Sequence, residues 1–292
     1  MSISTGVANP NDYNIGRGIL YFASVDSSGF PKEFRDLGNA TDFTLNLESE
    51  NIEHQSSRQG LRVTDKEVVV SQSMGVGFTL DEINFDNLAL FVSGETNTYT
   101  QAAIDFSSGG GTPGNDNVVL SGFGRWYDLY DEADLSSAGY PPQTPATIKR
   151  AYNLTDNANA VVNIAGGAAL DAADYTFDFT MGRLFIRSSP TTGALTATST
   201  LDVFFEAAST EIDEVFALTQ SSVSGALKFI SNNAANSSKK TEYQFHSVTL
   251  SPEGDFALIG DEFSTMQFNG SAEAREVVDP DSPTLRIRTF TQ

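Results

Sequence analysis

The stretch that decides the fold is Phe43–Gly94, FTLNLESENIEHQSSRQGLRVTDKEVVVSQSMGVGFTLDEINFDNLALFVSG. Apolar and polar residues alternate in Phe43–Leu47 and again in Val68–Leu80, which is the period of a strand with one buried face. Asn51–Asp65, between them, shows no such alternation. The stretch therefore predicts two strands joined by a long polar loop.

The end of the same stretch predicts the clearest helix of the chain, Asp81–Ser93. Asp81 is expected to cap the helix or to lie in its first turn, where Glu82 adds the negative charge that the helix dipole favours. Gly94 is expected at the C′ position, which favours glycine. We expect this short helix to lie over the sheet.

The predicted loop Asn51–Asp65 is unusually long, since hairpin loops commonly have about two to five residues. Loops of such length are usually functional or disordered. Two interpretations therefore stay open: a loop that contacts another subunit, and a mobile surface loop.

The rest of the chain consists mostly of short alternating runs, so the predicted class is mainly β. Asp174–Ile186 is typical of a hairpin. The expected organisation is a β-domain in two halves, residues 1–124 and 211–292, with a flexible arm over residues 1–14. A small β-rich unit, residues 125–210, is inserted between the halves.

The composition limits the possible partners. The 292 residues include 38 Asp and Glu, 17 Lys and Arg and no Cys, with a formal net charge of -21. Thiolate metal sites and disulfides are excluded. Binding of nucleic acid is disfavoured, because affinity for phosphates comes mainly from Lys and Arg. We expect neither a signal peptide nor a membrane span, since the N-terminus and the longest apolar runs lack the required patterns.

No pattern in the sequence predicts catalysis, so we expect no enzyme, no cofactor and no metal. His54 and His246 lack a visible third partner for a metal site or a catalytic group. Gly16-Arg17-Gly18 precedes a strand, whereas a dinucleotide-binding motif follows one. An acidic cluster lacks the ligand spacing of a calcium loop, and a solvated face is favoured for its members, Asp128, Asp131, Glu132 and Asp134.

Two segments, Leu37–Gly94 and Gly225–Phe263, resemble the major tail tube proteins of long-tailed, siphophage-like bacteriophages. The resemblance covers about Gly16–Gly94 and Gly225–Phe268, and the hairpin Asp174–Ile186 is similar in a more general way. It implies a β-sandwich or barrel with a flanking α-helix. It also implies a structural protein of the virion, assembled in the host cytoplasm, whose copies form rings of six that stack into a hollow tail tube. With the net charge of -21, the lumen is expected to be acidic and to let DNA pass during ejection into the host.

The resemblance also implies partners and positions. The partners are the chain itself, the tape-measure, tail-terminator and baseplate or tip proteins, and double-stranded DNA that passes without specific binding. Polar residues of the first strand are expected to face the lumen: Thr44, Asn46, Glu48 and Glu50. The long loop is expected to reach the adjacent ring through Ile52, Glu53, His54, Gln55, Ser56, Ser57, Arg58, Gln59, Gly60, Leu61 and Arg62.

Two other classes of function remain as alternatives. A carbohydrate-binding β-sandwich of a phage or bacterial surface protein would use aromatic side chains as a stacking platform, with the candidates Trp126, Tyr127, Tyr130 and Tyr140. A glycoside hydrolase would need two carboxylates about 5 to 10 Å apart, a spatial property that sequence does not reveal. For a tail tube, the inserted unit is expected to decorate the outside of a non-contractile tail.

Overall fold

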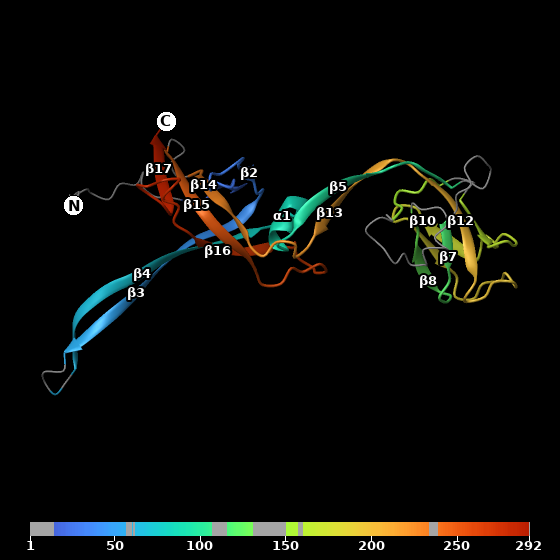
Figure 1. The fold of residues 1–292 in the computed structure, drawn as a ribbon, viewed down its shortest axis with the longest axis horizontal. Coiled ribbons are helices and arrows are strands. Elements are labelled where there is room, and N and C mark those ends of the chain that lie inside the picture. Colours follow the sequence, from blue (N-terminus) through green and yellow to red (C-terminus); the bar gives the residue numbers. More distant parts are fainter. Residues whose placement is uncertain are drawn as a thin grey trace. The chain divides into compact units, whose positions relative to one another are not determined.

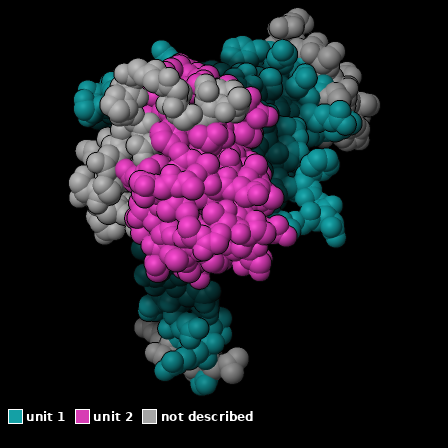
Figure 2. Space-filling model, turned by 90° about the vertical axis from the view of Figure 1, so that its right-hand side faces the viewer, with its two compact units in different colours: residues 1–97, 214–292 teal, residues 98–213 magenta. Residues whose placement is uncertain are grey.

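The computed structural model describes residues 15–56, 60, 62–106, 116–130, 150–156, 160–233 and 239–291. The chain forms two compact units, which are coloured separately in Figure 2. Unit 1 comprises residues 1–97 and 214–292, and unit 2 comprises residues 98–213. Strands dominate both units and only one α-helix occurs in the described residues, so the mainly β prediction is confirmed.

Unit 1 is built on an eight-stranded sheet in the order β2-β1-β14-β15-β16-β4-β3, with β17 also paired to β15 (Figure 1). These strands pair antiparallel, so neighbouring strands exchange hydrogen bonds directly across the sheet. The strands are β1 Gly18–Ser24, β2 Arg35–Asp36, β3 Ala40–Ser56, β4 Val63–Leu80, β14 Val223–Ser231, β15 Lys239–Glu253, β16 Met266–Ala272 and β17 Leu285–Thr291.

The core of unit 1 lies on one face of this sheet. Phe78 and Phe268 stack with ring centroids 4.8 Å apart, and Phe91 of the helix meets Phe268 edge-on at 5.7 Å. In β4, alternation puts Val76, Phe78 and Leu80 on this face and Gly75, Gly77 and Thr79 on the other. The buried members are Leu20, Phe22, Leu37, Val76, Phe78, Leu80, Val223, Leu227, Phe245, Val248, Leu250, Met266 and Phe268.

The helix α1, Phe85–Phe91, is shorter than predicted and begins later. Its N-cap is Asn84, not Asp81, because the side-chain oxygen of Asn84 accepts the backbone N–H of Asn87 at 2.8 Å. Asn87 is buried and donates in turn to the carbonyl oxygen of Leu37 at 2.9 Å. The helix is thereby tied to the strand region that precedes β3.

The C-terminal end of α1 also differs from the prediction. The residue in the left-handed conformation is Ser93, with φ 49°, not Gly94. The backbone N–H of Gly94 donates to the carbonyl oxygen of Ala89 at 2.8 Å. A side chain at Gly94 would collide with the carbonyl oxygen of Phe216, so this glycine is needed for a close backbone approach.

Strands β3 and β4 form one long hairpin, and the predicted loop Asn51–Asp65 is therefore wrong. They pair from Ala40 opposite Leu80 to Ser56 opposite Val63. Apolar alternation is missing in the outer part because both of its faces are exposed there, so no face has to be apolar. Ser57, Arg58, Gln59 and Leu61 lie outside the described residues, as does the predicted arm 1–14.

Unit 2 contains two small sheets around a separate core. One has the order β10-β11-β8, and in the other β12 pairs with β6, β7 and β9. The predicted hairpin Asp174–Ile186 is confirmed, with Tyr175 opposite Ile186 and Asp178 opposite Arg183. The strands are β6 Ile104–Phe106, β7 Asp116–Val119, β8 Arg125–Asp128, β9 Val161–Ile164, β10 Tyr175–Asp178, β11 Arg183–Ile186 and β12 Thr200–Ala207.

The first boundary of unit 2 differs from the predicted one. The unit begins at residue 98 instead of 125, because β6 and β7 pair with β12 and so belong to the same sheet. It ends at residue 213, whereas the sequence predicts an end at 210. The chain passes between the units along β5, Glu95–Gln101, and β13, Thr210–Phe216, which pair with each other.

Candidate functional site

The most unusual feature of unit 1 is the outer part of the β3–β4 hairpin, residues 44–56 and 63–73, which we call the hairpin arm. In Figure 1 its two strands run away from the rest of their sheet. Side chains on both of its faces are exposed, apart from the half-buried Ser56. The arm therefore has no hydrophobic core of its own.

The hairpin arm nevertheless carries many apolar side chains. Leu47 and Ile52 are each 61% exposed and Val70 is 56% exposed. The outer edges of both strands are unpaired in the described residues of the arm. Exposed apolar side chains and open strand edges are features of surfaces that commonly take part in contacts between chains. The exposed apolar residues of the arm are Leu45, Leu47, Ile52, Val63, Val68, Val69 and Val70.

The arm is also acidic. It contains Glu48, Glu50, Glu53, Asp65 and Glu67, against a single lysine. Neutral side chains donate to three of these carboxylates: Ser71 to Glu50, Thr64 to Glu53 and Asn51 to Glu67. His54 lies on Asp65, with Nδ1 and Oδ1 2.5 Å apart. Of the residues expected to join rings, Ile52, Glu53, His54, Gln55 and Ser56 lie in β3, and Gly60 and Arg62 lie between the strands.

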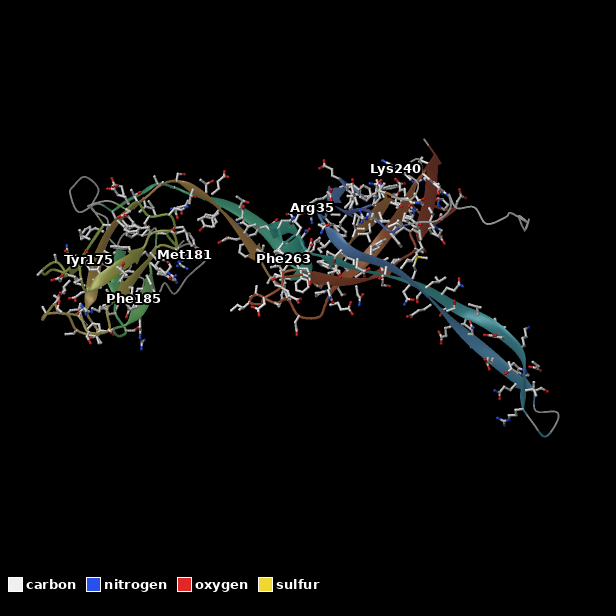
Figure 3. All side chains as sticks on the ribbon, turned by 180° about the vertical axis from the view of Figure 1, so that it is seen from behind. Arg35, Tyr175, Met181, Phe185, Lys240 and Phe263 are labelled. Carbon is white, nitrogen blue, oxygen red and sulfur yellow. The ribbon has the colours of Figure 1, made fainter. Side chains whose placement is uncertain are left out.

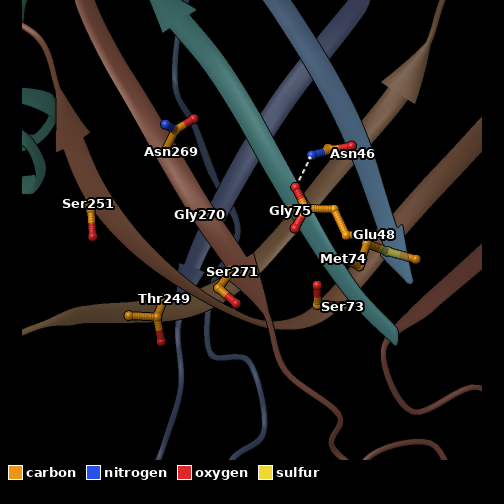
Figure 4. Close-up of a pocket in the computed structure, with 10 residues that line it drawn as sticks. All are labelled: Asn46, Glu48, Ser73, Met74, Gly75, Thr249, Ser251, Asn269, Gly270 and Ser271. Atoms are coloured by element: carbon orange, nitrogen blue, oxygen red, sulfur yellow. Dashed lines mark hydrogen bonds between the residues drawn. The ribbon is translucent and has the colours of Figure 1, made fainter. Parts of the chain in front are cut away.

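The residues expected to face a lumen lie together on the sheet face opposite the core. Asn46 stands opposite Gly75, which stands opposite Ser271, and Ser271 stands opposite Thr249. The next row contains Thr44, Gly77, Asn269 and Ser251. These positions, with Glu48 and Ser73, form what we call the polar face, and Figure 4 shows most of them around a shallow groove of about 380 Å³.

Glycine keeps the polar face flat. A Cβ on Gly77 would lie only 2.9 Å from the hydroxyl oxygen of Thr44. Glu50 follows on the same strand beside Ser71, further along the hairpin arm, and a register shift comes directly after it. Thr44, Asn46 and Glu48 thus belong both to the arm and to a polar face that three further strands continue.

A second exposed apolar feature is the connection between β15 and β16. Leu258 is 82% exposed, Ile259 97% and Phe263 95%. Phe263 is labelled in Figure 3. We call these three residues the apolar loop. The continuous apolar run Phe256–Ile259 favours a buried strand from the sequence alone, but in the structure no strand forms between Glu253 and Met266.

A third feature is a group of basic residues on β14, β15 and β17. These strands carry five basic side chains, Lys228, Lys239, Lys240, Arg286 and Arg288, but only two acidic ones, Glu242 and Glu253. For a chain with a net charge of -21 this is a local reversal of sign. The alternating arginines of TLRIRTF, residues 284–290, were a signal that the sequence analysis left unused.

The aromatic platform expected for a carbohydrate-binding module does not form as predicted. Tyr127 is buried in the core of unit 2, and its hydroxyl donates to the carbonyl oxygen of Gly122. Trp126 is 46% exposed, but the guanidinium of Arg183 lies 4.7 Å from its ring centroid. Tyr130 is half-buried, and Tyr140 lies outside the described residues.

Candidate metal and catalytic groups are dispersed. In the described part of the chain, no three His, Asp or Glu side chains gather as a metal site. Asp128 of the predicted acidic cluster pairs with Arg150 at 2.8 Å, and the other members, Asp131, Glu132 and Asp134, lie outside the described residues. His246 is buried beside Asp279, with Nε2 and Oδ2 3.3 Å apart.

The clearest electrostatic perturbations are structural and lie in unit 2. Hydrogen bonds from Thr191 and Thr192 lower the pKa of Asp174 to about 2, the backbone N–H of Thr191 making the largest contribution. The pKa of Asp178 is lowered by the backbone N–H of Met181 and by the side chain of Arg183. Both carboxylates fasten turns, so they do not form a reactive pair.

Comparison with known proteins identifies a family but no function. A family model described as "Protein of unknown function UCP028589" matches residues 13–106 and 147–281, which is more than half of the chain. The search of curated proteins gives no match. Among the described residues, no helix has the length and apolar composition that a membrane crossing requires.

Proposed function

The chain belongs to this family of unknown function, and from its own geometry we propose that it is a structural, self-assembling virion protein. In this proposal, copies of the chain form rings, and the rings stack into the hollow tail tube of a long-tailed bacteriophage. Tape-measure, tail-terminator and tip proteins would be its further partners. DNA would pass through the tube without being held.

The hairpin arm is the observation that carries the proposal. An exposed two-stranded ribbon is marginally stable at best in water. This arm also exposes Leu47, Ile52 and Val70 and leaves both of its outer edges open. Contact with other copies would cover the apolar side chains and the edges. Because the arm and its receiving surface would be different patches, such contacts are heterologous and can close into rings or propagate as tubes.

The polar face supports a role as the wall of a channel. Its side chains are small and mostly uncharged, as in the row Thr44, Gly77, Asn269 and Ser251. Such a surface offers few cations to the phosphates of DNA. Six copies would carry 6 × -21 = -126 formal charges in total, so electrostatic repulsion would keep DNA from adhering to the wall. Low friction would then be the mechanism, with no bond made or broken.

The apolar loop supports a further contact between copies. Ile259 and Phe263 are almost completely exposed, which is unusual for large apolar side chains of a monomer. Their neighbours Asp261 and Glu262 add negative charge beside these apolar side chains.

The proposal is tested by purifying the chain and following its association with concentration. Sedimentation velocity and negative-stain electron microscopy are expected to show rings or tubes in equilibrium with a smaller species. A monomer that persists at every concentration, and gives no rings or tubes in the microscope, would contradict the proposal. A glycan-binding signal from that monomer would favour the carbohydrate-binding alternative.

A further inference from the structure

We propose that the hairpin arm of one copy docks on the basic strands β14, β15 and β17 of a second copy. This inference rests on the proposed self-assembly and names the two surfaces that meet. It commits to a second copy of the chain as the occupant of the basic surface, because the charges of the two surfaces are complementary.

The basic surface is ordered by the register of the sheet. Lys228 stands opposite Gln244, which stands opposite Arg286, and Arg288 stands opposite Glu242. Lys240 lies on the same face one row further along. Directly opposite residues of antiparallel strands share a face. We call Lys228, Lys240, Arg286 and Arg288 the basic ladder.

The basic ladder keeps a positive charge after its internal pairs are counted. Glu242 lies between Arg288, at 2.7 Å, and Lys228, at 3.9 Å. Asp279 pairs with Arg286. Four basic side chains thus face two carboxylates, 4 - 2 = +2. The side chains of Arg286 and Arg288 are 32% and 41% exposed, and Lys240, labelled in Figure 3, is exposed.

The hairpin arm has the opposite charge. Its five carboxylates, Glu48, Glu50, Glu53, Asp65 and Glu67, outnumber the three basic side chains of the hairpin, which are Lys66 on β4 and Arg58 and Arg62 in the segment between the strands, 5 - 3 = 2. Ser71, Thr64 and Asn51 donate to three of them as neutral groups, so the negative charge is not cancelled. Apolar groups also match: Phe290, which stands opposite Lys240, is 52% exposed, and Ile52 of the arm is 61% exposed.

The arm of a subunit cannot cover the basic ladder of that same subunit. Strand β4 continues without a break from the arm into the sheet, where residues 74–80 pair with β16. The arm therefore extends from the edge of the sheet that β3 and β4 form. The basic strands β14 and β17 both pair with β15, and β16 separates β15 from β4 (Figure 1). The contact must be made between copies.

The contact would also solve a problem of the proposed channel. The basic ladder lies on the same side of the sheet as the polar face, since Phe229, Tyr243 and Leu285 of its strands point to the core instead. Uncovered cations on that side would bind the phosphates of passing DNA. An acidic arm from a second copy neutralises them, so the channel keeps its low friction.

Charge exchange tests the inference. The arm variant Glu50→Lys/Glu53→Lys and the ladder variant Lys240→Glu/Arg288→Glu are each expected to lower tube formation at least tenfold, whereas a mixture of the two variants assembles through its complementary surfaces. Glu211→Lys/Glu214→Lys, on β13, is the matched control and should assemble like the wild type. Unchanged assembly of both charge-reversed variants would overturn the inference.

A cysteine pair gives a second readout, because the chain has no cysteine of its own. Mixing Glu53→Cys with Lys240→Cys chains under oxidation is expected to give a disulfide-linked dimer, and mixing Glu53→Cys with Leu218→Cys chains is not. Equal cross-linking of both mixtures would contradict the proposed contact. So would wild-type tubes that bind DNA and release it when salt is raised, since the ladder would then be open to phosphate.

The outcome for the wild type separates the two proposals. If the wild type never assembles, the proposed function fails and the contact fails with it. If the wild type forms tubes, the charge-reversed variants assemble like the wild type and the Glu53→Cys/Lys240→Cys mixture gives no specific cross-link, then the proposed contact is wrong and the proposed function stands.

Discussion

Thr192 donates both its backbone N–H and its hydroxyl to the same carboxylate oxygen of Asp174, each at 2.7 Å. Thr191 donates its backbone N–H to the other oxygen at 2.8 Å. Asp174 itself is buried in unit 2, directly before β10. The carboxylate thus fastens the segment after β11 to the start of the hairpin, and its hydrogen bonds are strongest while it is ionised.

The stability of unit 2 is therefore expected to fall at acidic pH. The pKa of Asp174 is about 2 in the folded chain, below its ordinary value of 3.8. A lowered carboxyl pKa contributes stability that is complete above the ordinary value and is lost as pH falls through the folded value. Urea midpoints measured between about pH 5 and pH 2 should fall for the wild type. Asp174→Asn should remove much of this dependence and lower the midpoint at pH 7, whereas the exposed Asp171→Asn serves as the control.

Asn87 is expected to contribute strongly to the stability of unit 1. It is fully buried and donates to the carbonyl oxygens of Leu37 and Glu82, while Arg35 donates to its side-chain oxygen at 2.7 Å. Asn87→Ala leaves these groups without their partner, which costs about 1–3 kcal/mol for an unsatisfied buried group. Denaturant unfolding measures the loss. A change below about 0.5 kcal/mol, as expected for the exposed control Ser222→Ala, would show that the network is dispensable.

Removing the hairpin arm should separate folding from assembly. Ser49 and Gln72 stand directly opposite each other, so residues 50–71 can be replaced by an Asn-Gly turn that suits a two-residue hairpin. The core residues Val76 and Phe78 remain. We expect a folded subunit with a cooperative thermal transition that forms no tubes in the electron microscope. Tubes of normal length would instead exclude the arm from the contact between copies.

The apolar loop should matter for association and not for folding. Leu258→Ser/Ile259→Ser/Phe263→Ser changes side chains that are 82% to 97% exposed, so the free energy of unfolding should shift by less than about 0.5 kcal/mol per site. Sedimentation should show weaker association at the same protein concentration. Val277→Ser, at another exposed apolar position, is the control, and equal effects of both variants would argue against a specific role for the loop.

The hairpin arm shows where prediction from sequence fails. Phe43–Leu47 alternates between apolar and polar residues and was predicted as a strand, although only Phe43 packs against the core and Leu45 and Leu47 are exposed. Asn51–Ser56 has no buried face, so backbone pairing and contacts such as Thr64 with Glu53 hold this strand. Such interactions do not require apolar residues at every second position, so the sequence shows no alternation there. The same region was expected to contact other subunits, and that expectation survives as a proposal on a strand instead of a loop.

Features that depend on partners far away in the sequence could not be predicted either. Asn84 caps α1 although Asp81 is an equally good cap residue, and the carboxylate of Asp81 instead accepts hydrogen bonds from the side chain of Asn39. Tyr127 and Trp126 are neighbours, yet only alternation within β8 decides which of them is buried. The start of unit 2 was placed too late because the partners of β6 and β7 lie about a hundred residues away, in β12. By contrast, the strand that carries Thr44, Asn46, Glu48 and Glu50 was predicted, and its exposure to a lumen stays a prediction.

The paired strands β5 and β13 affect how such a chain can evolve. Unit 2 is entered and left along two neighbouring strands of one ribbon, so its two ends are held together. Domains whose ends are adjacent can be gained, lost or exchanged without rethreading their host. A turn that joins Asn97 to Glu214, which are linked by a side-chain hydrogen bond, would close unit 1 without the insert. Unit 2 is therefore an inserted domain whose sequence can diverge without changing the sheet of unit 1.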